Sequence, residues 1–142
     1  MPVTLIQQKP LFSKKVEGDK KLAIAEMFCD TIQGEGITTG VPSTFMRLQG
    51  CTLTCKWCDT LDVWQQGNED SFDEKFEMLE SESVMYKFMH DKQHLIFTGG
   101  SPLKQQDALV RFLKEFQTQY NFIPYIEVEN EAVLKPSSEF KY

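Results

Sequence analysis

Residues 44–60 read Thr44-Phe-Met-Arg-Leu-Gln-Gly-Cys51-Thr-Leu-Thr-Cys55-Lys-Trp-Cys58-Asp-Thr60, a short run that leads into three closely spaced cysteines. We expect a strand over Thr44–Gln49, whose carboxyl end delivers Cys51 into a loop. Parallel α/β barrels place their chemistry at the carboxyl ends of their strands. The stretch therefore predicts a ligand-bearing loop at that edge of a parallel sheet.

The three cysteines supply one ligand fewer than a closed metal site needs. A four-coordinate structural zinc, or a 4Fe-4S cluster used for electron transfer, usually takes four protein ligands. Three thiolates can instead leave one iron of a 4Fe-4S cluster open to a small chelating ligand, such as the amino acid end of S-adenosylmethionine. Zinc completed by His90 or His94, the chain's two histidines, and three unrelated thiols remain the alternatives.

The residues around the triad resemble one family closely. The matching stretches are Glu26-Met-Phe-Cys-Asp-Thr-Ile-Gln-Gly-Glu-Gly36, Gly40-Val-Pro-Ser-Thr-Phe-Met-Arg-Leu-Gln-Gly-Cys51, Cys55-Lys-Trp-Cys-Asp-Thr60 and Phe97-Thr-Gly-Gly-Ser-Pro-Leu103. Together they resemble the 7-carboxy-7-deazaguanine synthases, a family of radical S-adenosylmethionine enzymes, over residues 22–130. The resemblance favours the open 4Fe-4S cluster over zinc.

Further strands are expected at Leu22–Phe28, Leu95–Thr98 and Phe122–Glu129, with a loop over Asp30–Pro42. Alternating strands and helices predict right-handed parallel crossover units. The fold class is then α/β, as the N-terminal portion of an open partial (β/α) barrel of the radical S-adenosylmethionine type. We expect this domain over residues 22–142, after a polar, Lys-rich extension over residues 1–21.

Two helical regions separate these strands. Ser71 and Glu74 have the spacing of a capping box, and the helical pattern that follows is interrupted at residues 81–83. The later helix carries an apolar stripe made by Leu109, Phe112, Leu113, Phe116 and Tyr120. Both helices are expected to pack on the sheet.

Composition limits the function classes. The 142 residues are 41% hydrophobic, enough for one modest core, and no apolar run approaches a transmembrane helix or a signal-peptide core. We therefore expect a cytoplasmic protein without a membrane partner. The net charge of -6 argues against direct nucleic-acid binding. Cys29 is expected to be a small buried hydrophobe at the end of a strand.

The resemblance implies roles for the cluster loop and the glycine turn. It implies that Cys51, Cys55 and Cys58 ligate the cluster and that Thr60 offers its hydroxyl to Mg²⁺. S-adenosylmethionine would contact Trp57, Cys58, Asp59, Gly100 and Ser101. Without the family match, Trp57 would be interpreted as a core residue and Thr60 as part of a turn.

The resemblance also implies a pterin site formed by Ile32, Gln33, Gly34, Glu35, Arg47, Thr98 and Glu129. Arginine can bind a carboxylate through two parallel hydrogen bonds, which suits a pterin that bears a carboxyl group. The alternatives are a surface arginine at position 47 and a loop-ordering role for Glu35.

One position departs from the pattern. Many radical S-adenosylmethionine enzymes carry Gly-Gly-Glu at the turn where this chain has Gly99-Gly100-Ser101. A neutral serine would replace a charge-assisted hydrogen bond to the cofactor's ammonium group by an ordinary one. Glu127 or Glu129 on the next strand could supply the missing carboxylate.

The implied reaction is the radical conversion of 6-carboxy-5,6,7,8-tetrahydropterin to 7-carboxy-7-deazaguanine with loss of ammonia, a step of queuosine-type biosynthesis. The family continues through further strands, so we expect an electron donor and either a homodimer or a complementary C-terminal chain as partners. The rival interpretations are another radical enzyme, such as a glycyl-radical activase, and a non-catalytic subunit or remnant of a split enzyme.

Overall fold

The structure, a computed structural model, describes residues 20–49, 69–130 and 134–138. Within these ranges one mixed sheet has the strand order β3-β1-β2-β4-β5. The strands are β1 (Lys21–Ile32), β2 (Pro42–Leu48), β3 (Glu69–Ser71), β4 (His94–Thr98) and β5 (Tyr125–Val128). The helices are α2 (Phe72–Ser81), α3 (Val84–His90) and α4 (Gln106–Tyr120), with short 3-10 turns η2 (Gly36–Thr38) and η3 (Pro102–Gln105).

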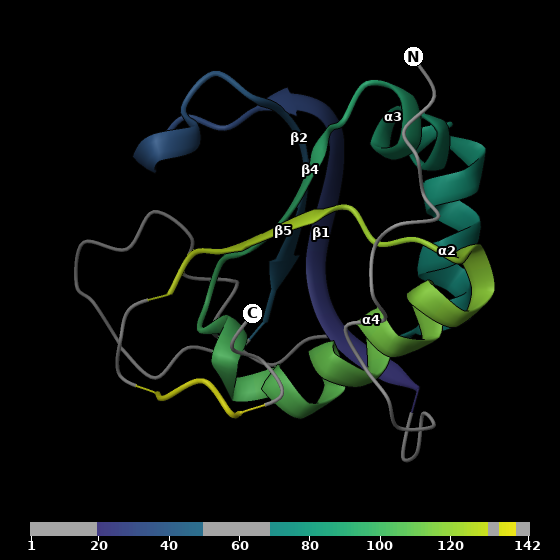
Figure 1. Ribbon diagram of the computed structural model, residues 1–142. Helices are drawn as coiled ribbons and strands as arrows, with labels where there is room; N and C mark the ends of the chain where they lie inside the picture. The colour runs from purple at the N-terminus through teal and green to yellow at the C-terminus, as the bar shows by residue number, and fades with distance from the viewer. Residues whose placement is uncertain (1–19, 50–68, 131–133, 139–142) are drawn as a thin grey trace.

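Strands β2, β4 and β5 are parallel, and helices lie in the connections between them. Figure 1 shows α2, α3 and α4 on one side of the sheet, with η2 projecting on the other. This arrangement confirms the α/β fold expected for part of a barrel. Strand β1 runs antiparallel to both β2 and β3.

Strand β1 is longer than expected, so the loop predicted over Asp30–Pro42 is confirmed for residues 33–41 but wrong at Asp30–Ile32, which belong to β1. Asp30 has φ +56°, and the register with β2 shifts between Phe28 and Thr31. Such an irregularity adds a residue to one strand and lets the ladder resume. Thr31 therefore pairs with Ser43, and the connection to β2 is shorter than expected.

Strand β5 is shorter than expected and begins at Tyr125, because Pro124 has no N–H to donate to a ladder. Phe122 and Ile123 precede it and are buried in the core. The polar strand β3 was not predicted, since Glu69-Asp-Ser71 has no apolar alternation to indicate it.

The helix predictions are confirmed. The Ser71 side chain accepts a hydrogen bond from the Glu74 backbone at 3.2 Å, and the Glu74 carboxylate accepts one from the Ser71 backbone at 2.7 Å. This capping box starts α2, and the expected interruption separates α2 from α3. The backbone bond from Ser71 lowers the pKa of Glu74.

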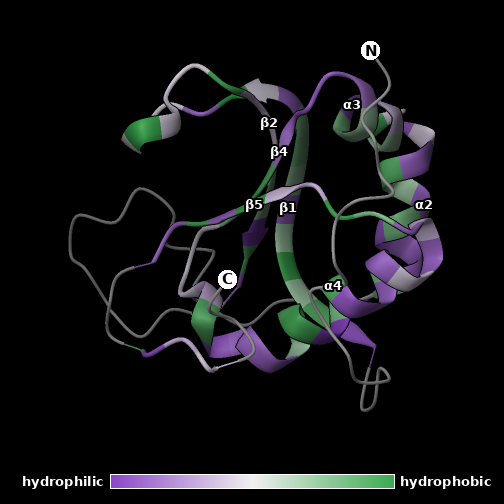
Figure 2. Cartoon of the chain, viewed as in Figure 1, coloured by the Kyte–Doolittle hydropathy of each residue, from purple (hydrophilic) through white to green (hydrophobic). Residues whose placement is uncertain are grey.

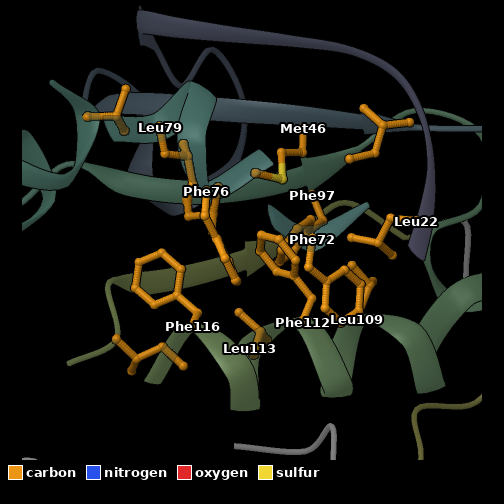
Figure 3. Packing of buried hydrophobic residues seen from close by; sticks show 14 of the residues in the cluster. Leu22, Met46, Phe72, Phe76, Leu79, Phe97, Leu109, Phe112, Leu113 and Phe116 are labelled. Atoms are coloured by element: carbon orange, nitrogen blue, oxygen red, sulfur yellow. The ribbon is translucent and has the colours of Figure 1, made fainter. Parts of the chain in front are cut away.

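An aromatic cluster joins the helices to the sheet (Figure 3). Phe112 on α4 lies within 5.0–6.5 Å, between ring centroids, of Phe72, Phe76, Phe97 and Phe116. The β2 and β4 residues on this face, including Met46, Leu48 and Leu95, are fully buried. Figure 2 shows polar and apolar residues mixed along α2 and α4, as expected for amphipathic helices covering a sheet.

Crossing a bilayer takes a longer and more apolar helix than any found in the described part of the chain.

Replacing Phe112 by alanine should lower the free energy of unfolding by about 3–5 kcal/mol, because a large buried aromatic group would leave a cavity among its neighbours. Urea denaturation would measure it. Tyr86→Ala is the control, since Tyr86 is 58% exposed on α3. A loss below about 1 kcal/mol in Phe112→Ala would contradict this account of the core.

Candidate functional site

The sheet has a second face, opposite the helices, where the polar residues of the candidate site lie. Side chains alternate between faces along a strand. Leu95 and Phe97 enter the helix-side core, so Ile96 and Thr98 lie on the other face. The same alternation places Phe45 and Arg47 of β2, and Glu127 of β5, on this second face, called here the open face.

Three of the expected substrate-site residues meet on the open face. The Gln33 amide donates to Glu129 Oε1 at 3.3 Å, and the Thr98 hydroxyl donates to Glu129 Oε2. Gln33 and Thr98 are both at least nine-tenths buried. Residues that follow β1, end β4 and follow β5 therefore form one hydrogen-bonded group.

The connection between β1 and β2, called here loop 33–41, carries the other expected residues of this region. Backbone bonds from Gln33 N to Val41 O (2.9 Å) and from Gly40 N to Gln33 O (2.7 Å) close the loop. The Gln33 side-chain oxygen accepts from Glu35 N at 3.2 Å, so Gln33 also orders the backbone around it. Gly34 and Glu35 are exposed, and Ile32 is 61% exposed at the end of β1.

Arg47 stands beside this group, because it pairs with Thr98 in the ladder between β2 and β4. Its Nε donates to Glu26 Oε1 at 2.7 Å, and its guanidinium carbon lies 5.7 Å from the centre of the Phe28 ring. These contacts hold the guanidinium at one edge and one face. Its two terminal amino groups have no hydrogen-bond partner among the described residues and could bind a carboxylate end-on.

Gly99 allows Arg47 to lie where it does. A Cβ atom at position 99 would come within 2.1 Å of Arg47 Cγ, and Gly99 has φ +70°. Both the space and the backbone conformation require glycine. The Gly-Gly turn therefore supports the expected carboxylate-binding arginine directly.

The expected cofactor-side residues of the turn lie next to it. Gly100 has φ +43°, and Ser101 is fully buried immediately before η3. Glu127 and Glu129, the two carboxylates suggested in place of a glutamate at position 101, already have hydrogen-bond partners within the protein. Glu129 accepts from Gln33 and Thr98, whereas Glu127 accepts from the Thr38 hydroxyl and pairs with His94 Nδ1 at 2.8 Å.

The histidines are placed away from the end of β2. His94 pairs with Ser43 at the beginning of the parallel ladder, about 16 Å along the strand from Leu48. His90 stacks on Tyr86 with ring centroids 4.4 Å apart. Among the described residues no group of three or more His, Cys, Asp and Glu side chains is arranged to hold a metal ion.

Cys29 lies within β1 rather than at its end, and it is only half-buried against the helix-side core. Burial is the main cause that raises its pKa, opposed by a hydrogen bond with Thr44. A thiol with a raised pKa is less available as a thiolate ligand.

Several predicted site residues lie outside the described residues: Cys51, Cys55, Trp57, Cys58, Asp59 and Thr60. The structure places the preceding residues, Leu48 at the carboxyl end of β2 and Gln49 just after it. Gln105 Nε2 donates to Gln49 O at 3.1 Å, which ties this point of the chain to η3.

Sequence reasoning missed three residues that contact the site, namely Glu26, Thr38 and His94. Glu26 was quoted within the family motif but given no role, although strand alternation could have paired it with Arg47. Thr38 was not singled out, and His94 was considered only as a zinc ligand, because their common partner is Glu127 on a strand distant in sequence.

Comparison with known proteins agrees with the sequence resemblance. Residues 32–128 match the family described as 4Fe-4S single cluster domain. A 7-carboxy-7-deazaguanine synthase of Buchnera aphidicola is 36% identical over 80% of this chain and 57% of its own. The Aquifex aeolicus enzyme is 31% identical over 92% and 55%, and the Escherichia coli K12 enzyme 37% over 56% and 41%.

A solved structure, that of QueE from Escherichia coli, superposes with a TM-score of 0.63 and 25% identity, covering 82% of this chain and 55% of the other. The chain spans about half the length of the curated relatives it matches. The resemblance to 7-carboxy-7-deazaguanine synthases is confirmed, and the chain belongs to the 4Fe-4S single cluster domain family.

Proposed function

We propose that this chain forms the front part of a radical S-adenosylmethionine enzyme that converts 6-carboxy-5,6,7,8-tetrahydropterin to 7-carboxy-7-deazaguanine. The observation that carries the proposal is the meeting of Gln33, Thr98 and Glu129 beside Arg47 on the open face. These residues come from four separate segments, and each was expected at a pterin site. The names of the similar curated proteins support the same activity.

The residue types suit this substrate. Arg47 would bind the carboxylate with its terminal amino groups, while Glu26 and the Phe28 ring hold the guanidinium in place. Gln33, Thr98 and Glu129 offer the amide, hydroxyl and carboxylate groups that a pterin's edge of ring nitrogens and an amino group can pair with. Each already has a protein partner, so substrate would enter an ordered polar group at little cost in side-chain entropy.

A cofactor bound by the three cysteines must suit three thiolate ligands. Cys51, Cys55 and Cys58 supply three soft thiolates, which suit a 4Fe-4S cluster with one open iron. When bound, the cluster and S-adenosylmethionine would supply the radical that removes a hydrogen atom from the substrate. Cofactor contacts are proposed for Trp57, Asp59, Gly100 and Ser101, and a Mg²⁺ ligand for Thr60.

The ligand assignment predicts a sharp difference among the four cysteines. After anaerobic reconstitution the chain should bind about four irons. Cys51→Ala, Cys55→Ala and Cys58→Ala should each abolish the cluster absorption, because each removes a thiolate ligand. Cys29→Ala is the matched control and should retain it. Stoichiometric zinc without iron in the unsubstituted chain, or cluster loss in Cys29→Ala, would contradict the assignment.

The carboxylate role of Arg47 is tested by Arg47→Lys. Lysine lacks the planar pair of donors, so the affinity for 6-carboxypterin should fall by about 1–3 kcal/mol, measured by pterin fluorescence titration. Cluster absorption should not change. Arg111→Lys on α4 is the control at the chain's other arginine, in the helix layer. Equal affinity of Arg47→Lys and the unsubstituted chain would refute this role.

A further strand is proposed to pair with β5. Among the described strands β5 has only β4 as a neighbour, and Tyr125 on it is 59% exposed. An unpaired strand edge favours association with another chain segment. We propose that a complementary C-terminal segment or a second copy covers it, and that an external electron donor reduces the cluster. Sedimentation velocity should then show self-association of this polypeptide, and a monodisperse monomer would contradict the second-copy form.

A further inference from the structure

Among the described residues, two side-chain hydrogen bonds join loop 33–41 to β5 and the residue that follows it, and only one of them comes from a loop residue expected at the substrate. The first is the bond from Gln33 to Glu129. The second is the bond from the Thr38 hydroxyl to Glu127 Oε1 on β5. The loop otherwise contacts solvent at its tip, where Ile37 is fully exposed. Figure 2 shows this apolar tip projecting from the fold.

Glu127 is itself held by a third segment. Its Oε2 lies 2.8 Å from His94 Nδ1, and the side chains of both are less than one-fifth exposed. The His94 ring packs against Tyr125, with centroids 4.3 Å apart. A carboxylate with this little exposure needs hydrogen-bond partners for its charge, and here β4 and loop 33–41 each supply one.

The geometry points to Glu127 as a positioning residue for substrate binding: it holds loop 33–41 over the open face through Thr38, with His94 fixing its orientation. This inference rests on the proposed pterin site. Glu127 uses both oxygens for these two partners. Gln33 and Glu35, five and three residues before Thr38, are the loop residues expected at the substrate.

The physical reason is loop entropy. Loop 33–41 is closed by bonds within itself, and those bonds fix its shape but not its position over the sheet. A loop that must be ordered when ligand binds loses affinity by the cost of ordering it. The Thr38–Glu127 bond makes that ordering part of folding, so that the loop is in place before substrate arrives.

Thr38→Val tests the inference, because valine keeps the shape of threonine and removes the hydroxyl. Exchange of the Gly40 and Val41 amides should be faster by about tenfold, and 6-carboxypterin should bind about tenfold more weakly, the size expected for one hydrogen bond to a charged acceptor. Thr38→Ser should restore both values. The melting temperature should move little, since the core is on the other face.

Thr39→Val is the matched control, since the Thr39 hydroxyl donates only to Gly36 O, within the loop, at 2.6 Å. It should leave pterin affinity within about twofold. In a Glu127→Ala background Thr38→Val should have no further effect, because both changes remove the same bond.

The outcomes are distinguishable. Unchanged exchange rates of the Gly40 and Val41 amides in Thr38→Val would show that the Thr38–Glu127 hydrogen bond does not hold the loop. Faster exchange with unchanged pterin affinity, while Arg47→Lys still binds weakly, would overturn the positioning role and leave the proposed function standing. Absence of pterin binding by the unsubstituted chain would overturn the proposed function and the positioning role together, and the exchange rates would still decide whether Glu127 holds the loop.

Discussion

Burial of one aromatic cluster against one face of the sheet is the constraint on which the remaining structure depends. Phe72, Phe76, Phe112 and Phe116 bring the helices to the same side as the inward residues of β2 and β4. Because side chains alternate along a strand, the face on which the helices pack determines which residues lie on the other face. Arg47, Thr98 and Glu127 are placed on the open face by packing that they do not take part in.

The open face is organised by hydrogen bonds rather than by apolar contact. Glu127 on β5 and Glu129 just after it place two carboxylates on this face, and each bonds to the connection between β1 and β2. The connection between β1 and β2 is thereby linked to the region of β5, which is not its neighbour in the sheet. Partly buried carboxylates fix such a connection well, because leaving one unpaired would be costly.

Local patterns predicted much of this architecture. The capping box at Ser71, the apolar stripe on α4 and the Gly-Gly turn depend on residues close in sequence, and all three were found as expected. The extension of β1 past Asp30 depends on a bulge against β2, which the local pattern does not indicate. The late start of β5 follows from Pro124, a local signal that the prediction overlooked. The grouping of Gln33 with Thr98 and Glu129 came from family resemblance, because no periodicity relates residues so distant in sequence. The bond from Thr38 to Glu127 had no sequence signal.

The close approach of Gly99 to Arg47 has a consequence for how this site can change during evolution. Any side chain at position 99 meets the aliphatic stem of Arg47 and also needs a backbone conformation with φ +70°. A substitution at position 99 is therefore blocked by two independent barriers, only one of which disappears if Arg47 is shortened first. Lineages that alter the charge at position 47 can do so by a single step, but they should still inherit glycine at position 99, long after the contact that required its small size has gone.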